Sequence, residues 1–312
     1  MRAPLASPIR RVRPALIAPA PLQPGDNLRG AALMVLSMVT FTCNDALIKF
    51  VAQDVPLYQS VTIRGVFVML GIWLFSLRQG GLRLRLDAQT RLPMVARTLA
   101  EIASTLLYLA ALVNMAIGDL SAVMQSLPLA VMLGAAFFYG EALGWRRLAA
   151  VLVGMVGVMM ILRPGTGTFG IWSVVALASM LTVAARDLVT RRFGRHVGST
   201  GIAFYAAASV TLTGLVLSLR EGWIRPDMGH LLLLMAAGGC LTAGYITAVA
   251  AMRVGEISAV APFRYTSLIA AILLGLFVFG EWPDLWTWAG SALVVGAGIY
   301  TIWREAQTAR RG

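Results

Sequence analysis

Long apolar runs, separated by short polar segments, dominate the chain from about residue 30 onward. A helix that crosses the hydrocarbon layer of a bilayer, roughly 30 Å thick, needs about 20 predominantly apolar residues. Ten runs approach or exceed this length, at residues 30–50, 57–77, 93–115, 119–140, 146–162, 171–190, 201–219, 230–252, 256–280 and 284–303. The pattern predicts an all-α membrane protein with ten transmembrane helices.

Composition supports the same class. Of the 312 residues, 58% are hydrophobic and 13% are charged, with a mean hydropathy of +0.77, whereas a soluble domain has about 25% charged residues. The net charge of +12 would suggest nucleic acid in a soluble protein, but here the basic residues gather between apolar runs. We therefore expect the lipid bilayer as the partner, and no nucleic acid.

The distribution of lysine and arginine predicts the orientation, because cytoplasmic loops collect these residues. With the N-terminus inside, 18 of the 26 basic residues fall in cytoplasmic segments, 3 in outside segments and 5 within spans. Both termini are therefore predicted to be cytoplasmic. Residues 1–28 contain a short apolar stretch that prolines interrupt, which is too broken for a signal peptide. We expect residues 1–28 to be a disordered cytoplasmic arm and residues 305–312 to be a cytoplasmic tail.

The two halves of the chain, 29–163 and 170–304, resemble each other. Residues 105–123 match residues 242–260 at a constant offset, with Thr, Tyr, Met, Gly, an acidic residue and Ser-Ala-Val recurring in register. Polar and aromatic residues recur in this way more readily in a true repeat than in chance similarity between apolar segments. Because each half has five spans, the second half must begin on the opposite side of the membrane. The sequence thus predicts two inverted five-helix repeats, an arrangement typical of secondary transporters with a solute site near the midplane.

With its paired five-helix units, the chain resembles the drug/metabolite transporter superfamily, in the ten-helix branch with two EamA-type domains. The motifs are the Gly-acid-x-Ser-Ala-Val element that opens the fourth helix of each unit and the Gly-Glu dipeptide that closes it, at 140–141 and 280–281. Within the superfamily it is most similar to bacterial amino-acid and metabolite exporters, including the aromatic amino-acid group. The resemblance implies an inner-membrane exporter of small solutes without a nucleotide-hydrolysing domain. We expect amino acids, including aromatic ones, as the solutes; the alternative is export or import of other small organic solutes or drugs, such as a nucleoside or a cationic compound. We expect the protein to act as a monomer or weak homodimer.

Polar residues on the third span form a candidate solute site. Glu101, Thr105 and Tyr108 are spaced by three or four residues and share one helical face. The matching span of the second half offers Thr242 and Tyr245. We expect both tyrosines to line a cavity between the halves, although such residues also form hydrogen bonds between neighbouring helices.

Interior prolines mark the fourth and ninth spans. Pro128 and Pro262 should each break the backbone hydrogen-bond ladder. Such a break persists at membrane depth only beside buried protein or a wet cavity. Near these breaks lie Gln125, Arg264 and Tyr265, which we expect to belong to the solute site. An intramembrane arginine is rare and marks a functional site by default. Two interpretations of Arg264 stay open: it holds a solute carboxylate through two parallel hydrogen bonds, or it pairs with an acid such as Glu101.

Charged residues near the ends of the first and sixth spans form a second group. Asn44 and Asp45 lie in the first span, and Asp45 is four residues before Lys49, the spacing of a pair within one helix. In the sixth span the same spacing separates Asp187, which follows Arg186, from Arg191. We expect Asn44 to bind the solute. We interpret the charged residues of this group as structural anchors or as gating or proton-coupling groups, and Arg64 of the second span as a candidate partner of Asp45.

Motifs of catalysis and cofactor binding are missing from the sequence. It contains no His-x-x-x-His, Cys-x-x-Cys, Gly-x-Ser-x-Gly or phosphate-binding glycine loop, so we expect no metal, no cofactor and no enzyme activity. A membrane enzyme would need convergent catalytic groups, and a channel would not need inverted halves with broken helices. We expect the acids at helix ends, including Glu141, Glu256 and Glu281, to act as caps. Ala150-x-x-x-Gly154 and Ala292-x-x-x-Gly296 are predicted to be helix packing elements.

Overall fold

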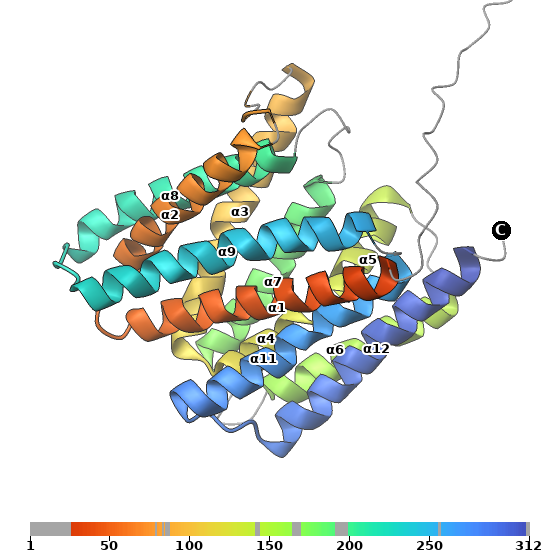
Figure 1. Ribbon diagram of the computed structural model, residues 1–312. Helices are drawn as coiled ribbons and strands as arrows, with labels where there is room; N and C mark the ends of the chain where they lie inside the picture. The colour runs from red at the N-terminus through yellow and green to blue at the C-terminus, as the bar shows by residue number, and fades with distance from the viewer. Residues whose placement is uncertain are drawn as a thin grey trace, which may run out of the picture.

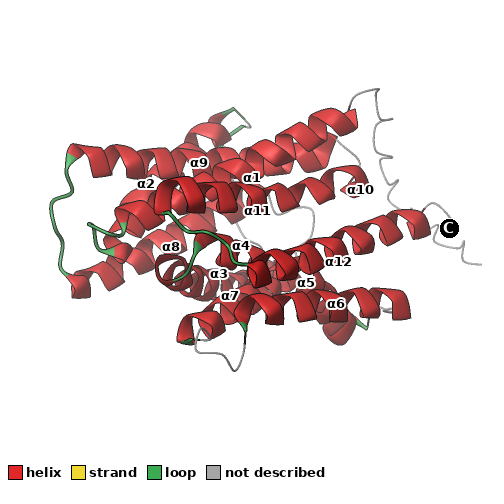
Figure 2. Cartoon of the chain, turned by 90° about the horizontal axis from the view of Figure 1, so that it is seen from below, coloured by secondary structure: helices red, strands yellow, loops and turns green. Residues whose placement is uncertain are grey.

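The computed structural model describes residues 26–309 apart from 79, 83, 85–87, 141–143, 164–169, 191–198 and 255–256. This part of the chain is helical and contains no strand (Figures 1 and 2). Its elements are α1 Asp26–Val51, α2 Leu57–Leu77, α3 Ala88–Asn114, α4 Ile117–Met124, α5 Leu127–Tyr139, α6 Trp145–Leu162, α7 Ile171–Thr190, α8 Ser199–Glu221, α9 Met228–Val254, α10 Ile257–Val260, the 3₁₀ turn η1 Ala261–Tyr265, α11 Thr266–Leu274, the π-helical turn η2 Gly275–Phe279 and α12 Leu285–Ala309. The predicted all-α membrane fold is confirmed.

Nine helical segments of the described chain are long and apolar enough to cross a bilayer. The remaining predicted span, 146–162, corresponds to α6, whose apolar part Leu148–Leu162 is shorter than the others. The predicted ends need correction. Helix α1 begins at Asp26, so the last residues of the expected arm are helical, and α12 continues to residue 309, into the expected tail. Residues 1–25 and 310–312 lie outside the described chain.

Two spans are interrupted where the sequence places proline. Helix α4 ends at Met124, a turn follows at Gln125 and Ser126, and α5 begins at Leu127 with Pro128 in its first turn. In the ninth span, the short α10 passes into the 3₁₀ turn η1, which has Pro262 in its first turn, before α11 begins. Proline has no N–H to donate and its ring clashes with the preceding turn. The interruptions predicted from the two prolines are therefore present.

Acidic side chains cap the N-termini of several helices. The carboxylate of Asp227 accepts a hydrogen bond from the backbone N–H of His230 at 2.7 Å, and this bond lowers the pKa of Asp227, which precedes α9. Asp284 accepts from the N–H of Thr287 at 2.9 Å at the start of α12. Glu281 accepts from the N–H of Ile117, the first residue of α4, at 2.8 Å. Such contacts satisfy N–H groups that have no partner within the helix.

The principal helix pairs each join a helix of the first half to a helix of the second half. The principal pairs are α1 with α9, α3 with α7, α2 with α8, and α6 with α12. Two further pairs, α5 with α7 and α1 with α11, also join one half to the other. If the five spans are numbered within each half, the first span of either half pairs with the third and the fourth span of the other, second pairs with second, and fifth pairs with fifth. The same set of pairs is obtained when the two halves are exchanged. Figure 1 shows α1 beside α9 and α2 beside α8.

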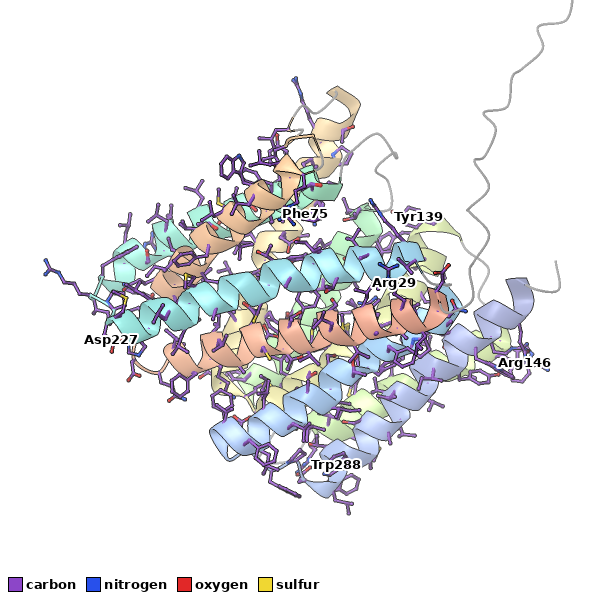
Figure 3. All side chains as sticks on the ribbon, viewed as in Figure 1. Arg29, Phe75, Tyr139, Arg146, Asp227 and Trp288 are labelled. Carbon is purple, nitrogen blue, oxygen red and sulfur yellow. The ribbon has the colours of Figure 1, made fainter. Side chains whose placement is uncertain are left out.

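The outer surface is apolar, and the ends of the bundle carry charges. Phe137 is 84% exposed and Phe277 is 79% exposed, as befits side chains that face lipid. Arg29 and Arg146 lie toward one end of the bundle and Asp227 lies at the other (Figure 3), which agrees with the sides that the charge distribution predicts for them.

Glycines let some of these helices approach closely, although not all at the predicted positions. A Cβ atom on Gly290 would lie 2.5 Å from the carbonyl oxygen of Gly157, so the α6 and α12 backbones are in contact there. Gly154 packs instead on Leu129 of α5, and Gly296 has nothing within 4 Å of its Cβ direction. The packing motif predicted at 292–296 is therefore wrong, and Gly157 with Gly290 makes the close contact.

Candidate functional site

A central cavity of about 360 Å³ lies among α1, α2, α3, α4, α7, α9 and the broken ninth span. Its volume falls in the range of small-molecule sites, about 300–1,000 Å³. The lining includes most of the predicted substrate residues, namely Asn44, Glu101, Thr105, Tyr108, Gln125, Tyr245 and Arg264. It also includes three residues predicted to be structural or gating groups, Asp45, Arg64 and Arg186. Segments from both halves thus bring their polar residues to one place.

One cluster on the cavity wall surrounds Asp45. The Tyr108 hydroxyl of α3 donates to Asp45 Oδ2 at 2.6 Å, and the Asn44 side-chain amide donates to Asp45 Oδ1 at 3.0 Å. Arg64 of α2 does not pair with Asp45 directly; its Nη1 donates to Asn44 Oδ1 at 3.2 Å. The Nε of Arg64 is buried and has no hydrogen-bond partner within the described chain. The expected pairing of Arg64 with Asp45 is therefore indirect, through the side-chain amide of Asn44.

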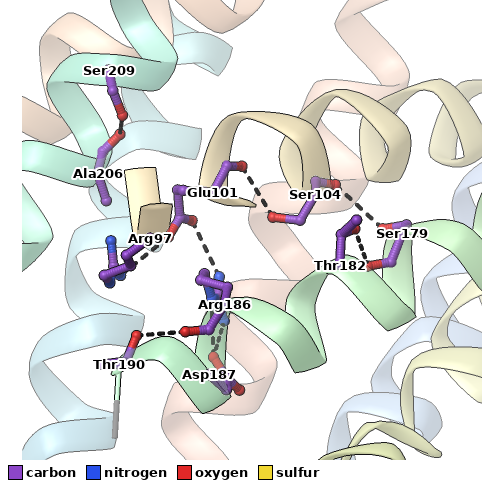
Figure 4. A network of polar contacts seen from close by, with 10 residues as sticks. All are labelled: Arg97, Glu101, Ser104, Ser179, Thr182, Arg186, Asp187, Thr190, Ala206 and Ser209. Carbon is purple, nitrogen blue, oxygen red and sulfur yellow. Dashed lines mark hydrogen bonds and ion pairs between the residues drawn. The ribbon is translucent and has the colours of Figure 1, made fainter. Parts of the chain in front are cut away.

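A second cluster surrounds Glu101 of α3 (Figure 4). Its Oε1 accepts from Arg186 Nη1 of α7 at 3.1 Å, and its Oε2 lies 3.1 Å from Arg97 Nη2, an ion pair without hydrogen-bond geometry. Arg186 Nη2 also pairs with Asp187 at 2.8 Å. Glu101 is 6% exposed and Arg97 is 8% exposed. This network connects α3 to α7 through buried charges, and loss of one member would leave another charge buried without its partner, which is costly.

Among the three arginines that line the cavity, Arg264 is the exposed one. It lies in the 3₁₀ turn η1 and is exposed to the cavity. No acidic side chain in the described part of the chain pairs with it. The alternative that Arg264 pairs with Glu101 is wrong, because Glu101 binds Arg97 and Arg186 instead.

Backbone breaks lie beside Arg264 on the cavity wall. The side-chain amide of Gln125, in the turn between α4 and α5, donates to the Ser267 hydroxyl at 2.5 Å. That hydroxyl in turn donates to the carbonyl oxygen of Arg264 at 3.1 Å. The breaks in the fourth and ninth spans are thus connected by side-chain hydrogen bonds, and polar groups gather at both.

Lys49 takes a different partner from the predicted one. Its Nζ lies 2.5 Å from Glu281 Oε1 and 2.5 Å from the carbonyl oxygen of Met115, rather than pairing with Asp45. The predicted Asp45–Lys49 pair is wrong because the oxygens of Asp45 are directed to Tyr108 and Asn44. Glu281 does cap a helix, as expected. Arg191, Glu141 and Glu256 lie outside the described residues.

Three predicted aromatic and hydroxyl residues have contrasting positions. Tyr245 lines the cavity and packs edge-on against Phe41, with ring centroids 5.2 Å apart. Thr242 lies between α9 and α2, where a Cβ on Gly71 would lie 2.7 Å from the Thr242 hydroxyl. The Tyr265 hydroxyl is directed to Gly298 of α12. The structure therefore places Thr242 and Tyr265 outside the cavity wall.

Sequence reasoning missed several residues of the cavity wall and its surroundings. It gave no role to Arg97, Phe41 or Ser267, and it placed Glu281 only at a helix end. Arg97 carried a signal, because a charge within a span is itself unusual. Ser267 and Phe41 carried none, since both are ordinary residues of a membrane helix.

Another hollow, of about 410 Å³, lies between α5, α6 and α7. Leu, Met, Phe, Ala and Val form nearly all of its lining, and Ser126 is its sole hydroxyl. It offers few groups to orient a polar solute. Among the described residues no group of three or more His, Cys, Asp or Glu could hold a metal ion. The polar central cavity is therefore the candidate site.

Comparisons with known proteins agree with a transport role. Sequence relatives include the S-adenosylmethionine uptake transporter of Rickettsia prowazekii, 23% identical over 281 residues, covering 90% of this chain and 95% of the relative. The pseudopaline exporter CntI of Pseudomonas aeruginosa is 27% identical over 272 residues, covering 86% and 94%. The riboflavin transporter of Vibrio cholerae is 28% identical over 191 residues, covering 61% and 64%.

A solved crystal structure superposes with a TM-score of 0.63 at 22% identity and covers 87% of this chain and 96% of its own, which shows a shared fold. The EamA-like transporter family matches the chain twice, at residues 28–163 and 170–303. With nearly the whole length matched and these relatives named as transporters, the chain belongs to the EamA-like transporter family and carries small metabolites across a membrane.

Proposed function

We propose that this protein is a secondary transporter that exports amino acids, including aromatic ones, across the bacterial inner membrane. The solute binds in the central cavity, where Arg264 holds its α-carboxylate. Cytoplasmic N- and C-termini follow from the distribution of basic residues. The protein needs no cofactor for this activity, and a monomer contains the whole cavity.

The unpaired guanidinium of Arg264 carries the proposal. Arg264 lies in the 3₁₀ turn that begins the apolar span Ala261–Phe279, and its side chain is exposed to the cavity. Within the described chain Glu101 pairs with two arginines, whereas Arg264 has no acidic partner. Its fork of N–H groups matches the two oxygens of a carboxylate. A solute carboxylate would therefore complete an interaction that the protein leaves open.

Alternating access is the mechanism that best fits the packing. The helix pairs are the same when the two halves are exchanged, as expected if a pseudo-two-fold axis relates inverted repeats. The fourth span of each half is broken, and each break borders the cavity. Rocking of one half against the other around a fixed midplane site is the usual consequence of such symmetry.

The named substrates of the relatives define the main alternatives. Relatives are named as uptake transporters or as exporters, for S-adenosylmethionine, pseudopaline and riboflavin. Both the direction and the solute could therefore differ from our proposal. S-adenosylmethionine has an α-amino and an α-carboxylate group, so it would satisfy the same Arg264 contact as a simple amino acid.

Reconstitution into liposomes tests the proposal. Purified protein should exchange labelled phenylalanine, and labelled S-adenosylmethionine, riboflavin, a nucleoside and a cationic dye form the comparison panel. Protein-free liposomes give the background. We expect saturable exchange of amino acids that excess unlabelled amino acid inhibits. Transport of riboflavin, nucleoside or dye with no amino-acid exchange would refute the amino-acid assignment and leave the transporter family unchanged.

A further inference from the structure

Two carboxylates line the central cavity, and their surroundings differ. Glu101 has two arginine partners, Arg97 and Arg186. Asp45 has no basic side chain at ion-pair distance among the residues that the structure describes; its partners are the Tyr108 hydroxyl and the Asn44 amide. The negative charge of Asp45 is therefore hydrogen-bonded but not neutralised by a direct partner.

The geometry leaves Asp45 capacity for another donor. A carboxylate has about four acceptor positions on its two oxygens, and each oxygen of Asp45 accepts one bond, from Tyr108 at 2.6 Å and from Asn44 at 3.0 Å. Asp45 is half-buried and lies on the cavity wall, so a solute can reach it. A primary ammonium group supplies three donors and the opposite charge.

Neighbouring residues hold Asp45 in this position. Tyr108 fixes one oxygen from α3, and Asn44, itself held by Arg64 Nη1 at 3.2 Å, fixes the other. A group whose partners fix its orientation recognises a ligand with less loss of conformational entropy. Arg64 contacts Asn44 and not Asp45 itself, so it orients the cluster without occupying the acceptor positions of Asp45.

We infer that Asp45 is the ammonium subsite of the cavity, with Tyr108 and Asn44 as its positioning residues. This inference rests on the proposed function and deepens it. Arg264 binds the carboxylate and Asp45 binds the ammonium group, so the cavity selects zwitterionic α-amino acids. A solute with only one of the two groups satisfies only one of the two charged side chains.

Three related probes separate the two subsites. Phenylalanine has both charged groups, 3-phenylpropionate lacks the ammonium group, and phenethylamine lacks the carboxylate. Because the two analogues cross bilayers in their neutral forms, their affinities are measured by competition against labelled phenylalanine bound to purified protein. For variants that no longer bind phenylalanine measurably, shifts in thermal stability on adding each probe replace the competition assay.

We expect Asp45→Asn to weaken phenylalanine and phenethylamine by about 10- to 150-fold, the effect of losing a hydrogen bond to a charged group. Its affinity for 3-phenylpropionate should change little. Asp45→Glu, which keeps the charge, should recover part of the phenethylamine affinity. The matched control is Asp54→Asn, because Asp54 lies outside the cavity and its side chain is 65% exposed.

The outcomes distinguish this inference from the proposed function. If the unaltered protein binds no amino acid, the proposed function fails. If it binds phenylalanine but Asp45→Asn weakens all three probes equally, or none of them, the ammonium subsite is refuted and the transporter assignment remains. Loss of the dependence of transport on a pH gradient, with all three affinities unchanged, would instead assign Asp45 to proton coupling and would also overturn the subsite.

Discussion

Replacing Arg264 tests the site most directly, because its role in folding and its role in binding can be separated. The side chain is exposed to the cavity and has no acidic partner in the described chain. Removing it therefore strands no buried carboxylate. We expect Arg264→Gln to change the free energy of unfolding by no more than about 0.5 kcal/mol, as at other positions without a structural partner.

The expected loss of binding is larger. A hydrogen bond to a charged group contributes about 1.5–3 kcal/mol, which corresponds to about 10- to 150-fold in affinity. Arg264→Gln should weaken phenylalanine by this factor. Arg264→Lys keeps the charge but loses the planar fork that binds both carboxylate oxygens, so we expect a smaller but clear loss. Phenethylamine, which has no carboxylate, should bind both variants nearly as well as the unaltered protein.

The assay combines initial rates of phenylalanine exchange in liposomes with the competition measurements on purified protein. Arg253→Gln is the matched control, because Arg253 is an exposed arginine in the last turn of α9 and does not line the cavity. Equal losses for phenylalanine and phenethylamine would mean that Arg264 shapes the cavity without contacting a carboxylate. Unchanged exchange by Arg264→Gln would refute the role altogether.

Three further predictions concern the surroundings of the site. Lys49→Met should cost about 3–5 kcal/mol of stability, measured by thermal unfolding in detergent, because it strands a partly buried carboxylate; an unchanged melting temperature would contradict the ion pair. Tyr108→Ala should weaken phenylalanine binding about 10-fold through the hydrogen bond to the aspartate, and Tyr245→Ala by less, with both variants monodisperse on size-exclusion chromatography. In a cysteine-free background, Leu84→Cys should react with an impermeant maleimide only after permeabilisation and Gln53→Cys in intact cells; the reverse result would overturn the orientation.

The sequence predicted the helices well because in a bilayer the signal is strong. Every backbone polar group must be satisfied within the lipid layer, so spans are long and apolar and their limits lie where charges begin. Pro128 and Pro262 predicted the two breaks for a local reason, the missing N–H. The end of α12 was less predictable, because amphipathic residues continue a helix beyond the apolar run without a change in local propensity.

Which polar residues share the cavity was also largely predictable, but their partners were not. A polar side chain within a span is costly wherever it lies, so its presence alone indicates a buried or wet position. Partner choice depends on tertiary packing. Lys49 has Asp45 at the helical spacing, yet it binds Glu281, 232 residues away. A pair within one helix contributes only about 0.2–0.5 kcal/mol, so the packing of α1 against the ninth span decides the pairing.

If the cavity binds amino acids as proposed, the balance of charge on its wall would give it selectivity. Arg64, Arg186 and Arg264 line the cavity together with two acids, Asp45 and Glu101. Glu101 is already bound by Arg186, and Arg64 is held by an amide oxygen at the edge of the Asp45 cluster. Arg64 is buried and bonded to Asn44, so Arg264 and Asp45 are the exposed guanidinium and the accessible carboxylate that face the cavity without a direct partner of opposite charge in the described chain. A solute with a single charge would leave one of them unsatisfied, and an unpaired charge in a low-dielectric site is costly. A zwitterion satisfies both, so discrimination against simple acids and simple amines follows from the protein's own unpaired groups.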